Sequence, residues 1–280
     1  MRHGIVMFTS DRSIAPASAA RVAEEAGFAS FCVPEHTHIP VRRDAAHPRT
    51  GDSSLPDDRY VRTLDPWVAL STAAAVTTRI RLGTAVALPA EHDPLALAKT
   101  IASLDHLAGG RVTLGVGFGW NTDELADHGV PPGKRRTVLR EYVEAMRALW
   151  TADEAAYDGE FVSFGPSWAW PKPAGDVPVV VGAAGTAKTF DWITRTGHGW
   201  MTTPGEDDLT DKIATLHRTW REAGRVGVPE VVALAGRPDL EQLDAWAAAG
   251  VTETLFGLPD RTEPEVAEYL HRLADTLARR

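Results

Sequence analysis

The chain has 280 residues, of which 44% are hydrophobic and 24% are charged, values typical of an ordinary globular protein. Its formal net charge of -9 argues against nucleic acid or an anionic membrane as the main partner. The single cysteine excludes an internal disulfide, and neither a signal peptide nor an apolar run of ~20 residues is present, so we expect a cytoplasmic protein.

Short apolar runs alternate with longer amphipathic ones from the N-terminus onward. Residues 4–9 predict a strand, and residues 15–27 predict a helix that a glycine ends. The next strand, 28–34, contains Cys32, which we expect to be a small buried thiol. The polar stretch from about His36 to Thr63 is too long for a connector, so we expect a lid or substrate loop, above all over residues 40–63.

The same alternation continues to the C-terminus. Further strands are expected at 80–88, 111–117, 177–183, 197–203, 229–236 and 252–259, and helices at 66–78, 93–110, 134–150, 186–197, 207–224, 239–250 and 263–279. Residues 157–164 contain an Asp-Gly turn and predict a small hairpin before the fifth barrel strand. About eight strand–helix units favour an α/β fold, a closed (β/α)8 TIM barrel in a single domain over residues 1–280, rather than an open doubly wound sheet.

Glycine stands at every second position where the strand 111–117 ends, in the stretch RVTLGVGFGWNTDEL. A dinucleotide-binding fingerprint requires G-x-G-x-x-G after a first strand, whereas this stretch reads G-x-G-x-G and lies in the middle of the chain. We therefore interpret it as a strand end at which a planar or anionic ligand lies against backbone N–H groups. Asn121, Asp123 and Glu124 follow directly and are available for hydrogen bonds.

The second candidate stretch is VPEHTHIP, which directly follows the strand 28–34. Its Glu35, His36 and His38 have spacing compatible with a metal site, but the other histidines are scattered along the sequence and offer no second cluster. A histidine beside a carboxylate is a tunable proton donor near neutral pH, which suits His36 with Glu35 orienting it. The alternative is that both are ordinary loop residues.

Two further strand ends carry small residues. Gly83, Thr84 and Ala85 on an apolar strand indicate close approach of a flat group, although small residues also fill barrel interiors. In VVVGAAGTAKTF, Thr186 is placed to cap the following helix, whose N-terminal amides and Lys188 could bind phosphate. A plain strand-to-helix turn is the alternative there.

Four pieces of the sequence together carry a resemblance that extends over nearly the whole chain. They are VPEHTHIP, RTLDPWVALSTAAAVTTRIRLGTAV, HDPLALAKTIASLDHLAGGRVTLGVGFGWNTDEL, and PVVVGAAG followed by TGHGWMT. The chain resembles the bacterial luciferase-like family of flavin- and deazaflavin-dependent oxidoreductases, in particular the branch that uses coenzyme F420. The resemblance implies a (β/α)8 barrel with the cofactor ring lying across the strand ends.

The resemblance also implies roles for individual residues around that ring. Gly117 and Gly119 would let the cofactor pass over the fourth strand, with Trp120 and Asn121 at its edge. A cis peptide at Ala85–Val86 would back the ring. The residues implied to grip the cofactor phosphate are Ala184, Gly185 and Thr186.

The implied activity is transfer of a hydride between C5 of the deazaflavin and a small organic substrate. His36 would donate or accept the proton, with Glu35 fixing its tautomer, and no metal would take part. Trp120 stands where the sugar-phosphate dehydrogenase branch has a glutamate, so a sugar phosphate is not the expected substrate. The resemblance implies a homodimer. An FMN-dependent monooxygenase, a non-catalytic flavin- or F420-binding protein and a metal-dependent hydrolase are the alternatives.

Overall fold

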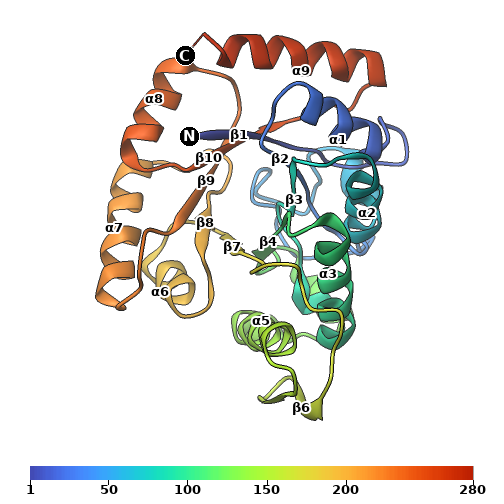
Figure 1. The fold of residues 1–280 in the computed structure, drawn as a ribbon, viewed down its shortest axis with the longest axis vertical. Coiled ribbons are helices and arrows are strands. Elements are labelled where there is room, and N and C mark those ends of the chain that lie inside the picture. The colour runs from blue at the N-terminus through green and yellow to red at the C-terminus, as the bar shows by residue number, and fades with distance from the viewer. Residues whose placement is uncertain (280) are drawn as a thin grey trace.

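A computed structural model describes residues 1–279 of the chain. Eight parallel strands form a closed barrel in the order β1-β2-β3-β4-β7-β8-β9-β10, with β10 pairing back to β1 (Figure 1). This confirms the predicted α/β barrel. The barrel strands are β1 Arg2–Val6, β2 Ser30–Val33, β3 Arg81–Thr84, β4 Val112–Gly117, β7 Val179–Gly182, β8 Gly199–Met201, β9 Glu230–Ala235 and β10 Glu253–Gly257.

Helices cover the outside of the barrel and alternate with its strands (Figure 1). The helices are α1 Pro16–Glu25, α2 Pro66–Val76, α3 Pro94–Ala108, α4 Thr122–Asp127, α5 Arg135–Thr151, α6 Ala187–Thr196, α7 Leu209–Glu222, α8 Leu240–Ala249 and α9 Glu263–Leu277. The Asp-Pro starts act as predicted, because Asp65 accepts a hydrogen bond from the amide of Val68 and Asp93 from that of Ala96, both at 2.8 Å.

Two segments interrupt the regular alternation. The predicted hairpin is present as β5 Ala155–Asp158 and β6 Ser163–Ser167, and it lies beside α5 at the lower end of Figure 1. The expected long loop follows β2 and contains only the 3-10 turn Asp58–Val61 before α2. The short helix α4 was not predicted, because its polar sequence TDELAD lacks an apolar period.

The strand β3 is shorter than the predicted 80–88 because the chain leaves the regular ladder after Thr84. The peptide bond between Ala85 and Val86 is cis, the isomer that the resemblance implies. The chain then returns to the sheet at Ala87, which forms a single parallel bridge with Val116. Residues 85–88 therefore lie at the end of the barrel where β2 and β4 also finish.

Apolar side chains fill both the space between barrel and helices and the barrel interior. The larger cluster includes Phe31, Phe190 and Trp200, all at most 1% exposed. The smaller cluster, inside the barrel, includes Cys32 and Met201. Strands buried on both faces explain the near-continuous apolar runs in the sequence.

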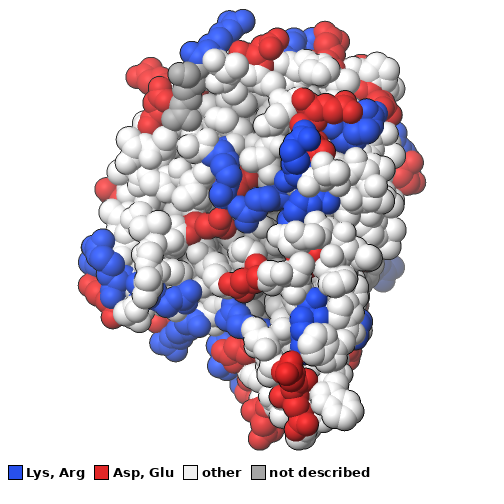
Figure 2. All heavy atoms as spheres, viewed as in Figure 1, with Lys and Arg blue, Asp and Glu red and all other residues white. Residues whose placement is uncertain are grey.

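Charged side chains lie in small groups on the outer surface (Figure 2). On the face drawn in Figure 2, the basic side chains near the middle are bordered by acidic ones, so charges of both signs lie side by side there. No helix within residues 1–279 combines the length and the apolar character needed to cross a bilayer.

Gly115 in β4 is required by the close approach of β3. A Cβ atom at this position would lie 2.0 Å from the backbone oxygen of Thr84, whereas one at Gly257 in β10 would meet nothing within 4 Å. We expect Gly115→Ala to lower the free energy of unfolding by about 1–3 kcal/mol. Chemical denaturation measures this change. The matched Gly257→Ala variant should stay within about 0.5 kcal/mol of wild type, and equal stability of the two variants would contradict the steric argument.

Candidate active site

Residues that follow β2 and β4 meet at the C-terminal end of the barrel strands. Nδ1 of His36 lies 2.8 Å from Oε2 of Glu124, and the two side chains are only 7% and 0% exposed. A carboxylate can only accept a hydrogen bond, so the neutral ring of His36 carries its proton on Nδ1. This arrangement leaves Nε2 as the ring nitrogen available to a substrate.

Glu124 also ties together the segments on either side of this pair. Its Oε1 accepts the backbone N–H of Thr37 at 3.0 Å, and its Oε2 accepts Nδ2 of Asn121 at 3.3 Å. Asn121 is 1% exposed and immediately precedes α4. Within residues 1–279, its Oδ1 is buried without a hydrogen-bond donor, so one acceptor at the site is unused.

The expected orientation of His36 by Glu35 is wrong. Glu35 precedes His36 in the chain, but its side chain pairs with other residues. Its carboxylate accepts the amide of Leu88 at 2.6 Å and Nε2 of His92 at 2.7 Å. Burial lowers the pKa of His92, but the hydrogen bond and charge of Glu35 outweigh burial and raise the pKa overall. Glu124 is therefore the residue that orients His36.

Aromatic rings from the long loop after β2 and from the segment after β4 lie close to His36. The Tyr60 ring lies 5.5 Å from that of His36, and the Trp120 ring lies 5.7 Å from it. His47 joins them, with its Nε2 3.0 Å from the Tyr60 hydroxyl and its ring 4.7 Å from Trp120. Burial, followed by the charge of Arg49, lowers the pKa of His47, which favours a neutral ring inside this cluster.

The same loop is anchored to the start of α4. Oδ2 of Asp123 accepts the backbone amides of Asp44 and Ala45 at 3.0 and 2.9 Å. With the ring contacts of His47 and Tyr60, this anchor holds the loop across the ends of β2 and β4. Its role as a lid or substrate loop stays a prediction.

Gly117 in β4 and Gly182 in β7 make room for the same side chain, that of Val86. A Cβ atom at Gly117 would lie 2.6 Å from a methyl group of Val86, and one at Gly182 would lie 2.5 Å from the other. Gly119 differs, because its φ of +73° is left-handed and a Cβ there would meet Leu125 at 2.7 Å. The absence of side chains at Gly117 and Gly182 therefore leaves room for Val86 at the barrel mouth, where it presents an apolar surface.

The turn after β7 forms the start of α6 as predicted. The Thr186 hydroxyl accepts the amide of Thr189 at 3.2 Å and so caps the helix. The amide of Gly185 donates to Glu206 at 3.1 Å, and Glu206 is paired with Lys212 at 2.7 Å. One amide of the predicted phosphate turn, which begins at Ala184, is therefore already bonded to a carboxylate.

The sequence interpretation missed part of this site by treating the histidines as scattered. His92 contacts Glu35, and Nε2 of His128 lies 2.8 Å from the hydroxyl of Thr37. Glu91 ends the 3-10 turn Pro89–Glu91 and His92 follows it, in the segment between β3 and α3, a position that could have marked them as site residues. Among residues 1–279, no three His, Cys, Asp or Glu side chains are arranged to hold a metal ion.

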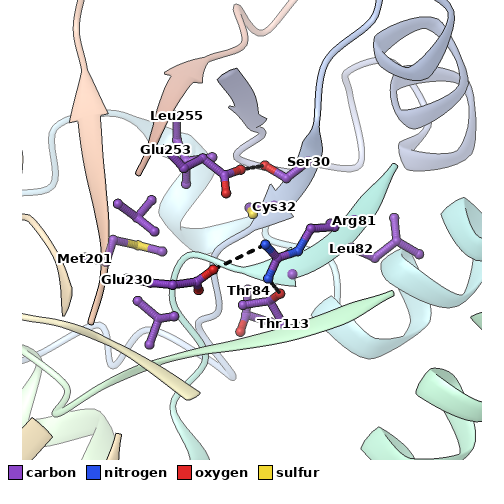
Figure 3. Close-up of a pocket in the computed structure, with 13 residues that line it drawn as sticks. Ser30, Cys32, Arg81, Leu82, Thr84, Thr113, Met201, Glu230, Glu253 and Leu255 are labelled. Carbon is purple, nitrogen blue, oxygen red and sulfur yellow. Dashed lines mark hydrogen bonds and ion pairs between the residues drawn. The ribbon is translucent and has the colours of Figure 1, made fainter. Parts of the chain in front are cut away.

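A second polar cluster lies inside the opposite end of the barrel, where the strands begin. Figure 3 shows the Ser30 hydroxyl bonded to Glu253 and the guanidinium of Arg81 between Glu230 and Thr113. These residues line a cavity of about 20 Å³, enough for one water molecule. The N-terminal end of such a barrel serves stability rather than catalysis.

The same cavity contains the single cysteine. Burial, followed by the charge of Glu253, raises the pKa of Cys32 to about 12. The thiol is therefore protonated at neutral pH and unreactive, which confirms the expectation of a buried structural cysteine.

Comparison with known proteins agrees with this geometry. A family model described as luciferase-like monooxygenase matches residues 16–276, so the chain belongs to the luciferase-like oxidoreductase family. An uncharacterized protein of Mycobacterium tuberculosis is 65% identical over 279 residues, which cover 99% of both chains. An F420-dependent glucose-6-phosphate dehydrogenase of Beutenbergia cavernae is 35% identical over 272 residues, 91% of this chain and 74% of that protein.

A solved structure shares the fold. The monooxygenase RslO1 from Streptomyces bottropensis matches with a TM-score of 0.77 at 22% identity, covering 100% of this chain and 99% of that one. At this level of identity the likeness supports the barrel architecture alone.

The pairing of His36 with Glu124 predicts a change in tautomer. In Glu124→Gln the amide can donate to Nδ1, so we expect the neutral His36 ring to shift its proton toward Nε2. Long-range ¹H–¹⁵N NMR of the histidine ring distinguishes the two tautomers. The exposed Glu25→Gln variant is the control, and an unchanged His36 pattern in Glu124→Gln would show that Glu124 does not set the tautomer.

Proposed function

We propose that the chain is an F420-dependent oxidoreductase that moves a hydride between the deazaflavin and a small organic substrate. The observation that carries the proposal is the buried His36–Glu124 pair. It faces Trp120 at the mouth of a luciferase-family barrel. A fixed tautomer with a free Nε2 is what a proton-transfer residue requires beside a hydride-transfer site.

The residues at the barrel mouth fit the ring of such a cofactor. Val86, seated in the space left by Gly117 and Gly182, presents an apolar surface suited to a flat ring. The buried Oδ1 of Asn121 lacks a donor within residues 1–279 and would accept a hydrogen bond from a ring N–H. An apolar bed with a few convergent polar groups is typical of cofactor pockets.

The start of α6 fits the phosphate end. Thr186 caps the helix, and the N-terminal amides of a helix favour an anion. The amide of Gly185 would contribute only if a bound phosphate displaced Glu206 from it. Lys188 lies in the first turn of α6 and is exposed, so it would add positive charge.

The roles of the protein residues follow from this arrangement. When bound, the deazaflavin supplies or receives a hydride at C5. His36 would exchange the accompanying proton with the substrate through Nε2, while Glu124 holds the ring in place. The loop carrying His47 and Tyr60 would exclude water from the mouth of the barrel, which strengthens the hydrogen bonds inside it.

The relatives support the cofactor assignment. A protein 35% identical to this chain over 272 residues is named as F420-dependent, and the motifs quoted from the sequence resemble the same branch. That relative acts on glucose 6-phosphate by name. Trp120 stands where that branch carries a glutamate, so we propose a substrate other than a sugar phosphate. The homodimer stays a prediction.

An FMN-dependent monooxygenase is the second candidate. The matching family is described by that activity, and FMN also joins a tricyclic ring to a phosphate. The apolar surface of Val86, the Oδ1 acceptor of Asn121 and the start of α6 would bind FMN in the same way. Binding preference separates the two candidates.

Side-by-side titration of the apo-protein with F420 and FMN tests the proposal. We expect F420 to bind at least about tenfold more tightly, a difference of ~1.4 kcal/mol. Fluorescence quenching and calorimetry measure both affinities. Tighter binding of FMN would support the monooxygenase, and binding of neither would overturn the site.

Replacement of the proton-transfer residue tests the proposed role of His36. With an identified substrate, His36→Asn should lower kcat by about 100- to 10,000-fold and leave cofactor affinity nearly unchanged. The exposed His271→Asn variant on α9 serves as the control. Full activity of His36→Asn would remove His36 from the mechanism.

A further inference from the structure

A chain of hydrogen-bonded side chains leads from His36 away from the barrel mouth. Glu124 is the partner of His36, and Glu91 lies beside Glu124 because both carboxyls bond to Thr37, Glu124 to its N–H and Glu91 to its hydroxyl. Oε2 of Glu91 accepts the hydroxyl of Thr37 at 3.1 Å. The Thr37 hydroxyl in turn lies 2.8 Å from Nε2 of His128.

Two fully buried carboxyl groups lie next to each other in this chain. The side chains of Glu91 and Glu124 are both 0% exposed. Three N–H donors converge on Glu124, from His36, Thr37 and Asn121. In contrast, Oε1 of Glu91 is buried without any donor in residues 1–279. One proton shared by the pair would satisfy this oxygen and remove the repulsion of two adjacent charges.

The far end of the chain reaches the surface. The His128 side chain is 29% exposed. Burial, followed by the charge of neighbouring His38, lowers the pKa of His128, so its ring is neutral at pH 7 and able to accept a proton. His38 also contacts the Thr37 hydroxyl at 3.1 Å and is bonded to the exposed Asp127 at 3.0 Å. The Thr37 hydroxyl therefore links two buried carboxyl groups to two solvent-facing histidines.

We propose that Glu124, Glu91 and Thr37 form a proton path between His36 and solvent at His128, and that the two glutamates share one proton. The path deepens the proposed function, because its use in turnover requires His36 to exchange a proton with the substrate. Glu91 and Thr37 are positioning residues, since they act through His36 rather than on the substrate.

The proton balance of the path is simple. When the substrate is oxidised, its hydride goes to the oxidised deazaflavin, and its proton goes to Nε2 of His36. Nδ1 then gives its proton to Glu124, the shared proton moves to Glu91, and Glu91 passes a proton to Thr37. The Thr37 hydroxyl releases its own proton to His128 and from there to water. One passage leaves the His36 proton on Nε2, so this proton must shift back to Nδ1 through water at the barrel mouth before the next oxidation. Reduction of a substrate runs each transfer in reverse, with no other reactant.

The electrostatics favour a neutral Glu91. Burial, followed by the charge of Glu124, raises the pKa of Glu91 to about 9, and the charge of Glu35 acts in the same direction. The hydrogen bond from the Thr37 hydroxyl acts in the opposite direction and lowers the pKa of Glu91. His128 faces the same carboxyl, with Nε2 4.0 Å from its Oε2. Because the pKa is raised, the neutral form is present below about pH 9 and is lost above it.

Infrared spectroscopy of the apo-protein tests the shared proton without any cofactor. We expect wild type at neutral pH to show the C=O stretch of a neutral carboxyl group, sensitive to D₂O, that disappears as the pH rises through about 9. Glu91→Gln should lack this band and the exposed Glu25→Gln should retain it. Absence of the band in wild type, or its persistence in Glu91→Gln, would overturn the shared proton.

A matched pair at Thr37 tests the path itself. Thr37→Val keeps the shape but removes the hydroxyl, whereas Thr37→Ser keeps the hydroxyl. In ¹⁵N-labelled apo-protein, the Nδ1 proton of His36 should exchange with water severalfold more slowly in Thr37→Val than in wild type or Thr37→Ser. Equal exchange in all three proteins would exclude the path.

The two proposals fail in different ways. The infrared and exchange experiments use the apo-protein, so they test the path even if the protein binds neither F420 nor FMN. In that case the proposed function fails and the path can still stand. In an active enzyme, Thr37→Val should lower kcat with an unchanged KM, and Thr37→Ser should restore it. An active enzyme without the neutral-carboxyl band would overturn the path and leave the proposed function intact.

Discussion

The arrangement of the barrel mouth depends on the burial of the Glu124 carboxylate. Removing a carboxylate from water is costly unless hydrogen bonds replace its hydration, and here three N–H groups do so. Those donors come from two segments that are far apart in the sequence, the one after β2 and the one before α4. Satisfying the carboxylate therefore fixes where His36 and Thr37 lie relative to Asn121. The tautomer of His36, the contacts of its ring with Trp120 and the route to Glu91 all follow from that position.

The two ends of the barrel treat buried charge in different ways. At the N-terminal end, carboxylates face cations and a hydroxyl, as Glu253 does with Arg2 and Ser30, so each charge has an opposite partner. At the C-terminal end, Glu91 lies beside Glu124, and the groups that face this pair include the hydroxyl of Thr37 and the rings of His36 and His128. Paired opposite charges stabilise one protonation state, whereas adjacent carboxyls make protonation adjustable. The contrast matches the division of such barrels into a stability face and a reactive face.

Most of the fold could be predicted from the sequence because its signals are local. The Asp-Pro helix starts, the glycine helix ends and the apolar strand runs each act within a few residues, and the structure confirms the barrel they indicate. Pairs of side chains from segments that are far apart in the sequence could not be predicted in the same way. The neighbours Glu35 and His36 suggested a pair, but Glu35 bonds to Leu88 and His92, and the true partner of His36 lies 88 positions away. The glycines were correctly linked to close approach at a strand end, yet the group that approaches Gly117 is Val86 of the same chain.

The loop between β2 and α2 is anchored on both sides of its middle. Before it, the amides of Asp44 and Ala45 bond to Asp123, and after it, Asp58 and Arg62 pair with Arg12 and Asp11. Between these points, residues 48–54 are exposed and make hydrogen bonds mainly with one another and with neighbours in the same loop. Natural variation in their number and chemistry can therefore accumulate without disturbing the barrel or the histidine beneath it. A protein built in this way is able to vary one loop over the barrel mouth while the buried residues beneath it stay in place.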